Sequence, residues 1–312
     1  MSRQDETPES NEGTDRRSLL KGTAGAAILG LSGVGAAHGA TAADGPAVKN
    51  GRIRQSIVHW CYEPAWPSID VYIKNVKALG VTSIELLPVK YFPALKEAGL
   101  TCAIGQIDMA PDPPFLKGFN NPANWDRVIK ATTDAIDACA EYGYKKVICF
   151  TGYKEGIPDD VGAKNCVEGY KKVIGHAEKK GITLCLEMLN SRVTSHPMKG
   201  HPGYQGDHCD YCFDIIKRVG SPNLKLLFDV YHVQIMDGDI ITRLRENREY
   251  IGHVHVAGNP GRGELDQAQE IYFPPIMSTL LEIGYDGFVG QEFIPTRDPF
   301  QGLHEAISVC DV

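Results

Sequence analysis

The sequence predicts a single (β/α)8 barrel. Eight segments with strand character alternate with helical segments along residues 43–312. Such alternation is typical of a parallel sheet covered by helices, because parallel strands need long crossover connections. Without the first 42 residues, about 270 of the 312 residues remain, which is close to the roughly 250 residues of a typical barrel. No Pro-, Gly- or Ser-rich linker divides residues 43–312, so we expect one domain.

The N-terminal half of the barrel contains four of the expected strands. They lie at 54–59, 81–87, 101–106 and 146–151, with helices at 68–79, 91–98 and 124–142 between them. A Pro-rich loop, residues 110–122, precedes the last of these helices. Asn124 is expected to cap that helix and Gly143 to end it, since these residue types favour helix ends.

The C-terminal half contains the most apolar strand, Ile182–Asn190. It follows a helix at 161–180 that ends at Gly181, and its sequence is nearly all apolar. Such a run is typical of a strand buried on both faces. A polar loop, a helix through Val219 and strands at 224–232, 251–257 and 287–293 complete the expected order. A carboxylate at Glu187, near the end of a buried strand, is costly unless it is paired or bound to a cation.

The last four expected strands each carry a metal-ligand type near the carboxyl end, where barrels place their chemistry. These residues are Glu187, Asp229, His255 and Glu292. Three carboxylates and an imidazole suit Mn²⁺ or Mg²⁺, with Co²⁺ and Zn²⁺ as alternatives. A purely structural network of buried acids would need cations, and no Lys or Arg lies within those strand ends. The pattern therefore favours a site for one divalent metal ion.

Several motifs carry a resemblance to a known family. They are Leu186–Asn190, Phe228–His232, His253–Ala257, Asn259–Arg262, and Gly284–Phe288 running on to Gln291-Glu292. On these motifs the chain resembles the hydroxypyruvate isomerase branch of the xylose-isomerase-like sugar isomerases and epimerases. The resemblance covers nearly all of residues 43–312 and is densest from Glu187 onward.

The resemblance implies roles for individual residues. It implies that one divalent metal binds to Glu187, Asp229, His255 and Glu292, and that Glu187 and Glu292 flank the substrate as acid/base residues. It also implies that His232 contacts a substrate hydroxyl and that Arg262 holds a carboxylate or a terminal hydroxyl. In typical hydroxypyruvate isomerases Gln tends to replace His255, whereas ketose 3-epimerases usually have His there. This departure does not change the expected metal site, but it leaves the identity of the substrate open.

The expected reaction moves a carbonyl along a small hydroxy-keto acid or sugar. A metal chelated by the substrate oxygens would stabilise an enediolate, and two carboxylates would remove and return the proton. We expect hydroxypyruvate to be converted to tartronate semialdehyde, or a related small sugar to react. A ketose 3-epimerase or a 3-keto-sugar lyase on the same site is the alternative. A secreted, non-catalytic carbohydrate-binding barrel and a multi-zinc endonuclease are more distant ones, the latter lacking extra His ligands and a basic groove.

Other residues have two interpretations each. His59 and Glu85 lie near strand ends and either contact substrate or form hydrogen-bonded walls of the pocket. Trp60 and Trp125 either line a sugar site or pack in the core, which the sequence favours. The loop at 190–208 is either a lid or a solvated loop. Its histidines are His196, His201 and His208.

The N-terminal 42 residues resemble a twin-arginine export signal. Arg16-Arg17 precedes Leu-Leu-Lys, a weakly apolar run from Gly22 to Ala37, and a small-residue cleavage site at Ala40–Ala42. We therefore expect export to the periplasm or beyond, although hydroxypyruvate is normally an intracellular metabolite. A cytoplasmic protein with a polar tail is the alternative.

The net charge, the hydropathy and the cysteines restrict the kinds of binding partner that we expect. The net charge of −7 gives no support to nucleic acid or anionic lipid as a partner. No segment after the signal is apolar enough to enter a membrane, and a homo-oligomer is compatible with the sequence. The nine cysteines are expected to be mostly structural, because Cys209-Asp-Tyr-Cys212 lacks the partners of a zinc site.

Overall fold

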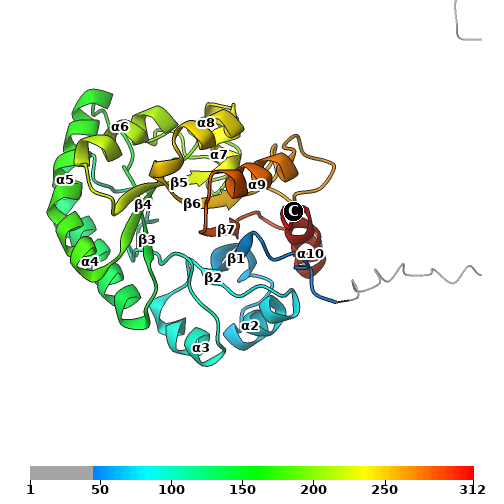
Figure 1. The fold of residues 1–312 in the computed structure, drawn as a ribbon. Helices are drawn as coiled ribbons and strands as arrows, with labels where there is room; N and C mark the ends of the chain where they lie inside the picture. Colours follow the sequence, from blue (N-terminus) through cyan, green and yellow to red (C-terminus); the bar gives the residue numbers. More distant parts are fainter. Residues whose placement is uncertain (1–44) are drawn as a thin grey trace, which may run out of the picture. The chain divides into compact units, whose positions relative to one another are not determined.

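The computed structural model describes residues 45–312, so the expected signal at residues 1–42 lies outside the described residues. The described part is a curled parallel sheet surrounded by helices (Figure 1). Seven named strands follow the order β2-β1-β7-β6-β5-β4-β3, and every neighbouring pair is parallel. The strands are β1 (Arg54–Val58), β2 (Ile84–Glu85), β3 (Lys146–Cys149), β4 (Thr183–Glu187), β5 (Leu224–Asp229), β6 (Ile251–Val256) and β7 (Phe288–Gln291).

The sheet closes through the strand expected at 101–106. Parallel bridges join Ser83 to Thr101 and Gly105 to Val147. The amide of Leu86 donates to the carbonyl of Ile104 over 3.0 Å, so this segment pairs with both ends of the named order. The predicted (β/α)8 barrel is therefore confirmed. Because this segment pairs only at isolated bridges, it has no strand label, and the expected fifth strand is β4.

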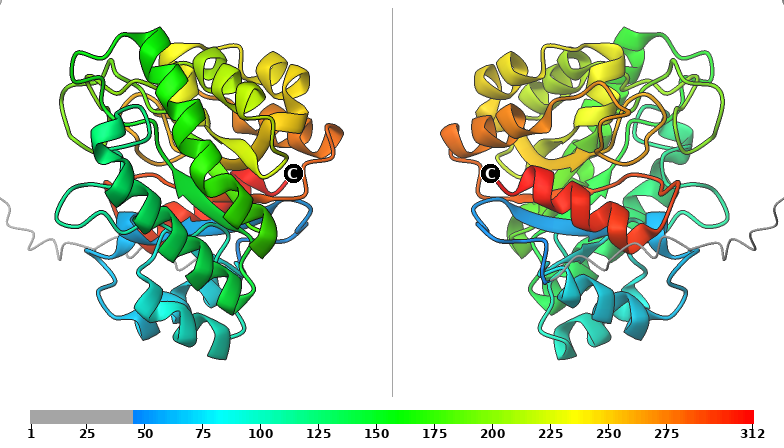
Figure 2. Two further views of the ribbon diagram at one scale, coloured as in Figure 1. Left: turned by 90° about the vertical axis from the view of Figure 1, so that its left-hand side faces the viewer. Right: turned by 90° about the vertical axis from the view of Figure 1, so that its right-hand side faces the viewer.

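Helices lie outside the sheet, and α4 and α5 pack side by side on its surface (Figure 2). The helices are α1 (His59–Tyr62), α2 (Ile69–Ala78), α3 (Phe92–Glu97), α4 (Trp125–Tyr142), α5 (Asp159–Lys180), α6 (Cys209–Val219), α7 (Val230–Met236), α8 (Ile240–Glu246), α9 (Phe273–Glu282) and α10 (Pro299–Cys310). The helices predicted at 68–79, 91–98 and 161–180 are confirmed within two residues at each end.

Two local predictions were wrong. Asn124 does not cap α4 with its side chain; instead Asn121 accepts from the amide of Ala123 at the start of a 3-10 turn before the helix. The strand expected at 224–232 ends at Asp229, whose carboxylate accepts from the amide of Tyr231 over 2.8 Å and caps α7. His232 therefore lies on the first turn of a helix. The predicted stop at Gly143 is confirmed, since its φ of 79° is left-handed.

The core is continuous between the sheet and its helices. All nine cysteines are buried and unpaired, including both members of the Cys209–Cys212 motif, so they pack as small apolar side chains as expected. Within residues 45–312, no helix combines the length and apolar character that crossing a membrane requires.

Candidate metal centre and its cavity

The four residues expected to bind a metal meet at the carboxyl ends of neighbouring strands. Glu187 ends β4, Asp229 ends β5, His255 lies in β6, and Glu292 follows β7. Because these strands are adjacent and parallel, their carboxyl ends lie together at one end of the barrel. One ligand atom from each residue lies within 4.8 Å of the others, and all four side chains are buried.

The chemistry of this cluster fits a divalent cation. Oxygen and imidazole nitrogen donors are the ligands that Mn²⁺, Mg²⁺ and Zn²⁺ accept. Among the described residues, Glu187 Oε1 is buried without a hydrogen-bond partner. A buried carboxylate oxygen without a donor is costly, and a bound cation would remove that cost. The four residues therefore form a candidate metal centre.

Arg262 lies against the same carboxylates, which the sequence argument did not anticipate. Its Nη2 atom donates to Glu292 Oε2 over 2.6 Å and approaches Asp229 Oδ2 at 3.3 Å, while Nη1 donates to the carbonyl of Met198. The side chain is buried, and its φ of 53° turns the loop after β6 back toward the site. The acids therefore have a cationic side chain beside them, contrary to the expectation from the strand ends alone. The guanidinium compensates part of their charge.

The pKa values of the two glutamates are pushed in opposite directions. Burial, followed by the charge of Glu292, raises the pKa of Glu187 to about 7. Burial also raises the pKa of Asp229, to about 6, although Arg262 opposes it. For Glu292, Arg262 and His255 together outweigh burial and lower the pKa to about 2. In the metal-free protein Glu187 therefore titrates near neutral pH, whereas Glu292 remains ionised.

A cavity of about 180 Å³ opens beside this cluster. Glu187, Glu292 and Arg262 lie in its wall, and most of the remaining wall is apolar. That apolar part is formed by Trp60, Leu86, Pro114, Phe115, Ile148, Phe150, Leu189 and Met198. Trp60, for which the sequence favoured core packing, also donates its indole N–H to Glu292 Oε1 over 3.1 Å. Its position just after the end of β1 is the feature of the sequence that could have placed Trp60 at the cavity.

His232 lies behind the cluster. Its Nδ1 accepts from the amide of Asn190 over 3.0 Å, and its Nε2 lies 3.4 Å from Asp229 Oδ2. Burial, followed by Arg262, holds the pKa of His232 well below its ordinary value. The imidazole is therefore neutral and carries its proton on Nε2, facing Asp229. A contact with a substrate hydroxyl stays a prediction.

Glu85 and His59 lie close to the site but outside the wall of the cavity in the described structure. Glu85 is fully buried, and its Oε1 lies 2.7 Å from His255 Nε2 and 3.0 Å from His253 Nε2. Burial raises the pKa of Glu85, but the two histidines outweigh it, so the carboxyl stays ionised. His59 stacks on Tyr72 with ring centroids 5.1 Å apart.

The loop after β4 covers the cavity. His201 is 1% exposed, lines the cavity, and packs its ring 4.3 Å from Phe115. Its amide donates to the carbonyl of Asn190, and the Tyr231 hydroxyl donates to the carbonyl of Lys199. The solvated-loop interpretation is therefore wrong for His201, whereas His196 and His208 are exposed. The sequence does not predict the burial of His201, because a single buried residue in a polar loop produces no periodic hydrophobic pattern.

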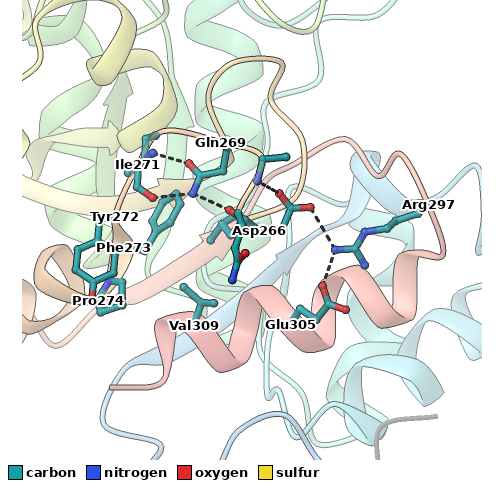
Figure 3. A pocket seen from close by; sticks show the side chains of 12 residues that line it. Asp266, Gln269, Ile271, Tyr272, Phe273, Pro274, Arg297, Glu305 and Val309 are labelled. Carbon is teal, nitrogen blue, oxygen red and sulfur yellow. Dashed lines mark hydrogen bonds and ion pairs between the residues drawn. The ribbon is translucent and has the colours of Figure 1, made fainter. Parts of the chain in front are cut away.

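A second hollow lies on the outside of the barrel, between residues 265–274 and α10 (Figure 3). Its volume is about 670 Å³, and Arg297 spans one side by pairing with Glu305 and Asp266. Tyr272 is 74% exposed beside it. The residues that line this hollow include none of the sequence-predicted site residues, whereas Glu187, Arg262 and Glu292 line the smaller cavity.

Comparison with known proteins agrees with this architecture. The family model described as "Xylose isomerase-like TIM barrel" matches residues 73–310, well over half of the chain. A human protein named putative hydroxypyruvate isomerase is 37% identical over 137 residues, which are 44% of this chain and 47% of that protein. A 2-oxo-tetronate isomerase of Cupriavidus necator is 34% identical over 151 residues, 47% of this chain and 55% of that protein. The chain thus spans about half the length of these curated relatives.

Two solved structures share the fold. An AP endonuclease, family 2, from Brucella melitensis has a TM-score of 0.71 at 23% identity, covering 80% of this chain and 97% of that chain. The 3-keto-D-glucoside 4-epimerase from E. coli has a TM-score of 0.67 at 20% identity, covering 82% of this chain and 98% of that chain. At these identities the likeness establishes the fold alone.

Proposed function

The chain belongs to the xylose isomerase-like TIM barrel family, and from this premise we propose that it is a divalent-metal-dependent isomerase of a small hydroxy-keto acid. The observation that carries the proposal is the meeting of Glu187, Asp229, His255 and Glu292, with ligand atoms within 4.8 Å of one another. Three of these are carboxylates, and together with one imidazole they suit Mn²⁺ or Mg²⁺, with Co²⁺ and Zn²⁺ as alternatives.

The proposed reaction converts hydroxypyruvate to tartronate semialdehyde through an enediolate. A proton leaves the hydroxymethyl carbon, and a proton is added to the former carbonyl carbon. The hydroxyl proton moves from one of the two substrate oxygens to the other, so atoms and charge balance. A bound cation would supply Lewis-acid stabilisation of the negative charge that develops on the substrate oxygens. Glu187 lines the cavity, so its carboxylate is placed to take up and return a proton of the substrate.

Glu292 has a different part in this proposal. Its Oε1 accepts from Trp60, and its Oε2 accepts from Arg262, so the carboxylate is fixed in position and in charge. A carboxylate held in this way is suited to orient the substrate by accepting a hydrogen bond from its hydroxyl group. Arg262 lies in the cavity wall. When a cation replaces the guanidinium beside the acids, the planar guanidinium would be free to bind the substrate carboxylate.

The substrate class rests on the relatives and on the cavity. The two relatives are named for hydroxypyruvate and 2-oxo-tetronate, which are both short keto acids. A cavity of about 180 Å³ is smaller than the 300–1,000 Å³ typical of larger ligands. Both observations favour an acid of three or four carbons over a free hexose.

A 3-epimerase or a 3-keto-sugar lyase is the second candidate on the same site. Glu187 and Glu292 both line the cavity, and epimerisation requires that one group remove a proton from one face and another return it from the opposite face. His255 in the ligand set also agrees with this alternative, as the sequence resemblance implies.

A substrate panel separates these activities. Purified protein loaded with Mn²⁺ is incubated with hydroxypyruvate, a 2-oxotetronate and a series of ketoses, and the products are identified by NMR. The proposal expects turnover of the keto acids and its loss in Glu187→Gln and in Glu292→Gln. Full activity in both variants would contradict it.

Export is proposed as well, on the strength of residues 15–42 alone. The twin arginines, the weakly apolar run and the small-residue site resemble a twin-arginine signal. Replacing Arg16-Arg17 by Lys-Lys is expected to retain the protein inside the cell, which fractionation of cells carrying both forms would test.

A further inference from the structure

Glu85 reaches His255 across two intervening strands. It ends β2, and the sheet order places β1 and β7 between β2 and β6, on which His255 lies. The carboxylate crosses the interior of the barrel to bring Oε1 within 2.7 Å of His255 Nε2. Such a path needs free space on the strands between.

Gly290 provides that space on β7. It is paired in register with His255, and a Cβ atom at this position would lie 2.3 Å from Glu85 Oε1 and 2.7 Å from His255 Cδ2. Any larger residue would displace one of the two. The glycine backbone therefore packs directly against the Glu85–His255 pair and restricts the imidazole ring.

A second histidine binds the same oxygen. His253 lies two residues before His255, so both side chains point to the same face of β6, into the barrel. Its Nε2 lies 3.0 Å from Glu85 Oε1, and the two imidazole rings meet edge to face at 5.0 Å. All three side chains are fully buried. One carboxylate oxygen thus accepts from two imidazoles in the buried interior of the barrel.

The opposite edge of His255 faces the candidate metal centre. Its Nδ1 lies 2.8 Å from Glu292 Oε2 and 3.5 Å from Glu187 Oε1. Burial lowers the pKa of His255, but the carboxylates on both edges of the ring outweigh it and raise the pKa well above its ordinary value. A bound cation would displace the proton from Nδ1, while Nε2 keeps its proton facing Glu85. A histidine that binds a metal usually donates its other N–H in this way, and the acceptor fixes both the tautomer and the ring orientation.

We propose that Glu85 is a positioning residue that holds His255, with its proton on Nε2, so that Nδ1 is presented to the cation bound by Glu187, Asp229 and Glu292. The proposal rests on the metal-dependent function put forward above. It assigns to Glu85 a role through His255, where the sequence left a substrate contact and a hydrogen-bonded wall residue as alternatives.

Two substitutions test this role in the full-length protein. Glu85→Gln keeps the shape and an acceptor oxygen but removes the charge, and Glu85→Leu removes the acceptor. Loss of such an outer contact typically weakens metal binding 10- to 100-fold. We expect the Kd for Mn²⁺, measured by the EPR signal of free Mn²⁺, to rise about 10-fold with Gln and about 100-fold with Leu. If the Leu variant does not fold, the Gln variant alone decides.

Asp237→Asn is the matched control, because Asp237 also pairs with a histidine, His208, at 2.6 Å but belongs neither to the candidate ligands nor to the wall of the cavity. Its Kd for Mn²⁺ should equal that of the wild type. A second readout is the ¹⁵N NMR spectrum of the imidazoles in protein loaded with diamagnetic Zn²⁺, in which the Nε2–H form of His255 should be lost with Glu85→Leu. If the wild type binds Mn²⁺ and Glu85→Gln binds it with the same Kd, the positioning role is overturned while the metal centre stands. No Mn²⁺ binding by the wild type would instead overturn the proposed function.

Discussion

Replacing Glu187 by Gln is expected to stabilise the metal-free protein, increasingly so as the pH rises. In the folded chain the Glu187 carboxyl has a pKa of about 7, against an ordinary value of 4.5, because it is buried beside Glu292. Its pKa is therefore raised by folding. The folded protein binds the proton of Glu187 more tightly than the unfolded chain does. The stability that this protonation contributes is complete below pH 4.5 and is lost as the pH rises through 7.

The size of the effect follows from that difference in pKa. One pKa unit corresponds to about 1.4 kcal/mol, so the ionised Glu187 side chain costs about 3 kcal/mol at pH 8 and less than about 1 kcal/mol at pH 5. Glutamine is neutral throughout. The unfolding free energy of Glu187→Gln relative to wild type should therefore rise by about 2–3 kcal/mol between pH 5 and pH 8. Any constant effect of the amide on packing cancels in this comparison.

Urea denaturation in the presence of EDTA, at four pH values from 5 to 8, measures this quantity. Glu141→Gln is the control, because Glu141 is exposed and forms no ion pair in the described structure. Its difference from wild type should not change with pH. A flat difference for Glu187→Gln as well would refute the argument that burial and Glu292 hold this carboxyl partly protonated.

Four further outcomes are expected. Arg262→Met should lower the unfolding free energy of the metal-free protein by about 3–5 kcal/mol, since it leaves buried carboxylates unpaired, and less when Mn²⁺ is present; an equal loss in both conditions would contradict this. Trp60→Phe should reduce kcat/KM about 10- to 100-fold, because a hydrogen bond to a charged group is worth about 1.5–3 kcal/mol; unchanged kinetics would show that the contact with Glu292 does not contribute to activity. Mn²⁺ at 100 times its Kd should raise the unfolding free energy by about 2.7 kcal/mol, measured with and without EDTA, and no shift would argue against the metal centre. Gly200→Ala should speed tryptic cleavage at Lys199, because the added Cβ would lie 2.2 Å from the carbonyl of Val193; an unchanged rate would show that the loop accommodates it.

The sequence predicts the barrel well because its signals are local and repeated. Apolar strands, helix stops such as Gly143 and Gly181, and acids near strand ends each follow from a few consecutive residues. The segment at 101–106 is predicted as a strand, yet it pairs only at Thr101 and Gly105. Pairing depends on both neighbouring strands, which no local pattern describes.

The ligand set of the candidate metal centre is predicted, but the contacts around it are not. Arg262 reaches Glu292 only because a loop with a left-handed residue turns back over the barrel. Trp60 and His201 line the cavity because helix α1 and the loop after β4, which are far apart in sequence, meet there. Glu85 looks like a pocket residue by its position in the chain, and only the space left by Gly290 directs it to His255.

The most direct test of the central claim is the exchange of carbon-bound protons in D₂O. Metal-free protein is mixed with hydroxypyruvate, with and without added Mn²⁺, and deuterium in substrate and product is followed by ¹H NMR. We expect Mn²⁺-dependent incorporation at the carbons that gain or lose a proton, and its loss in Glu187→Gln. Exchange that is independent of added metal, or that persists undiminished without the Glu187 carboxylate, would contradict the proposed chemistry of this site.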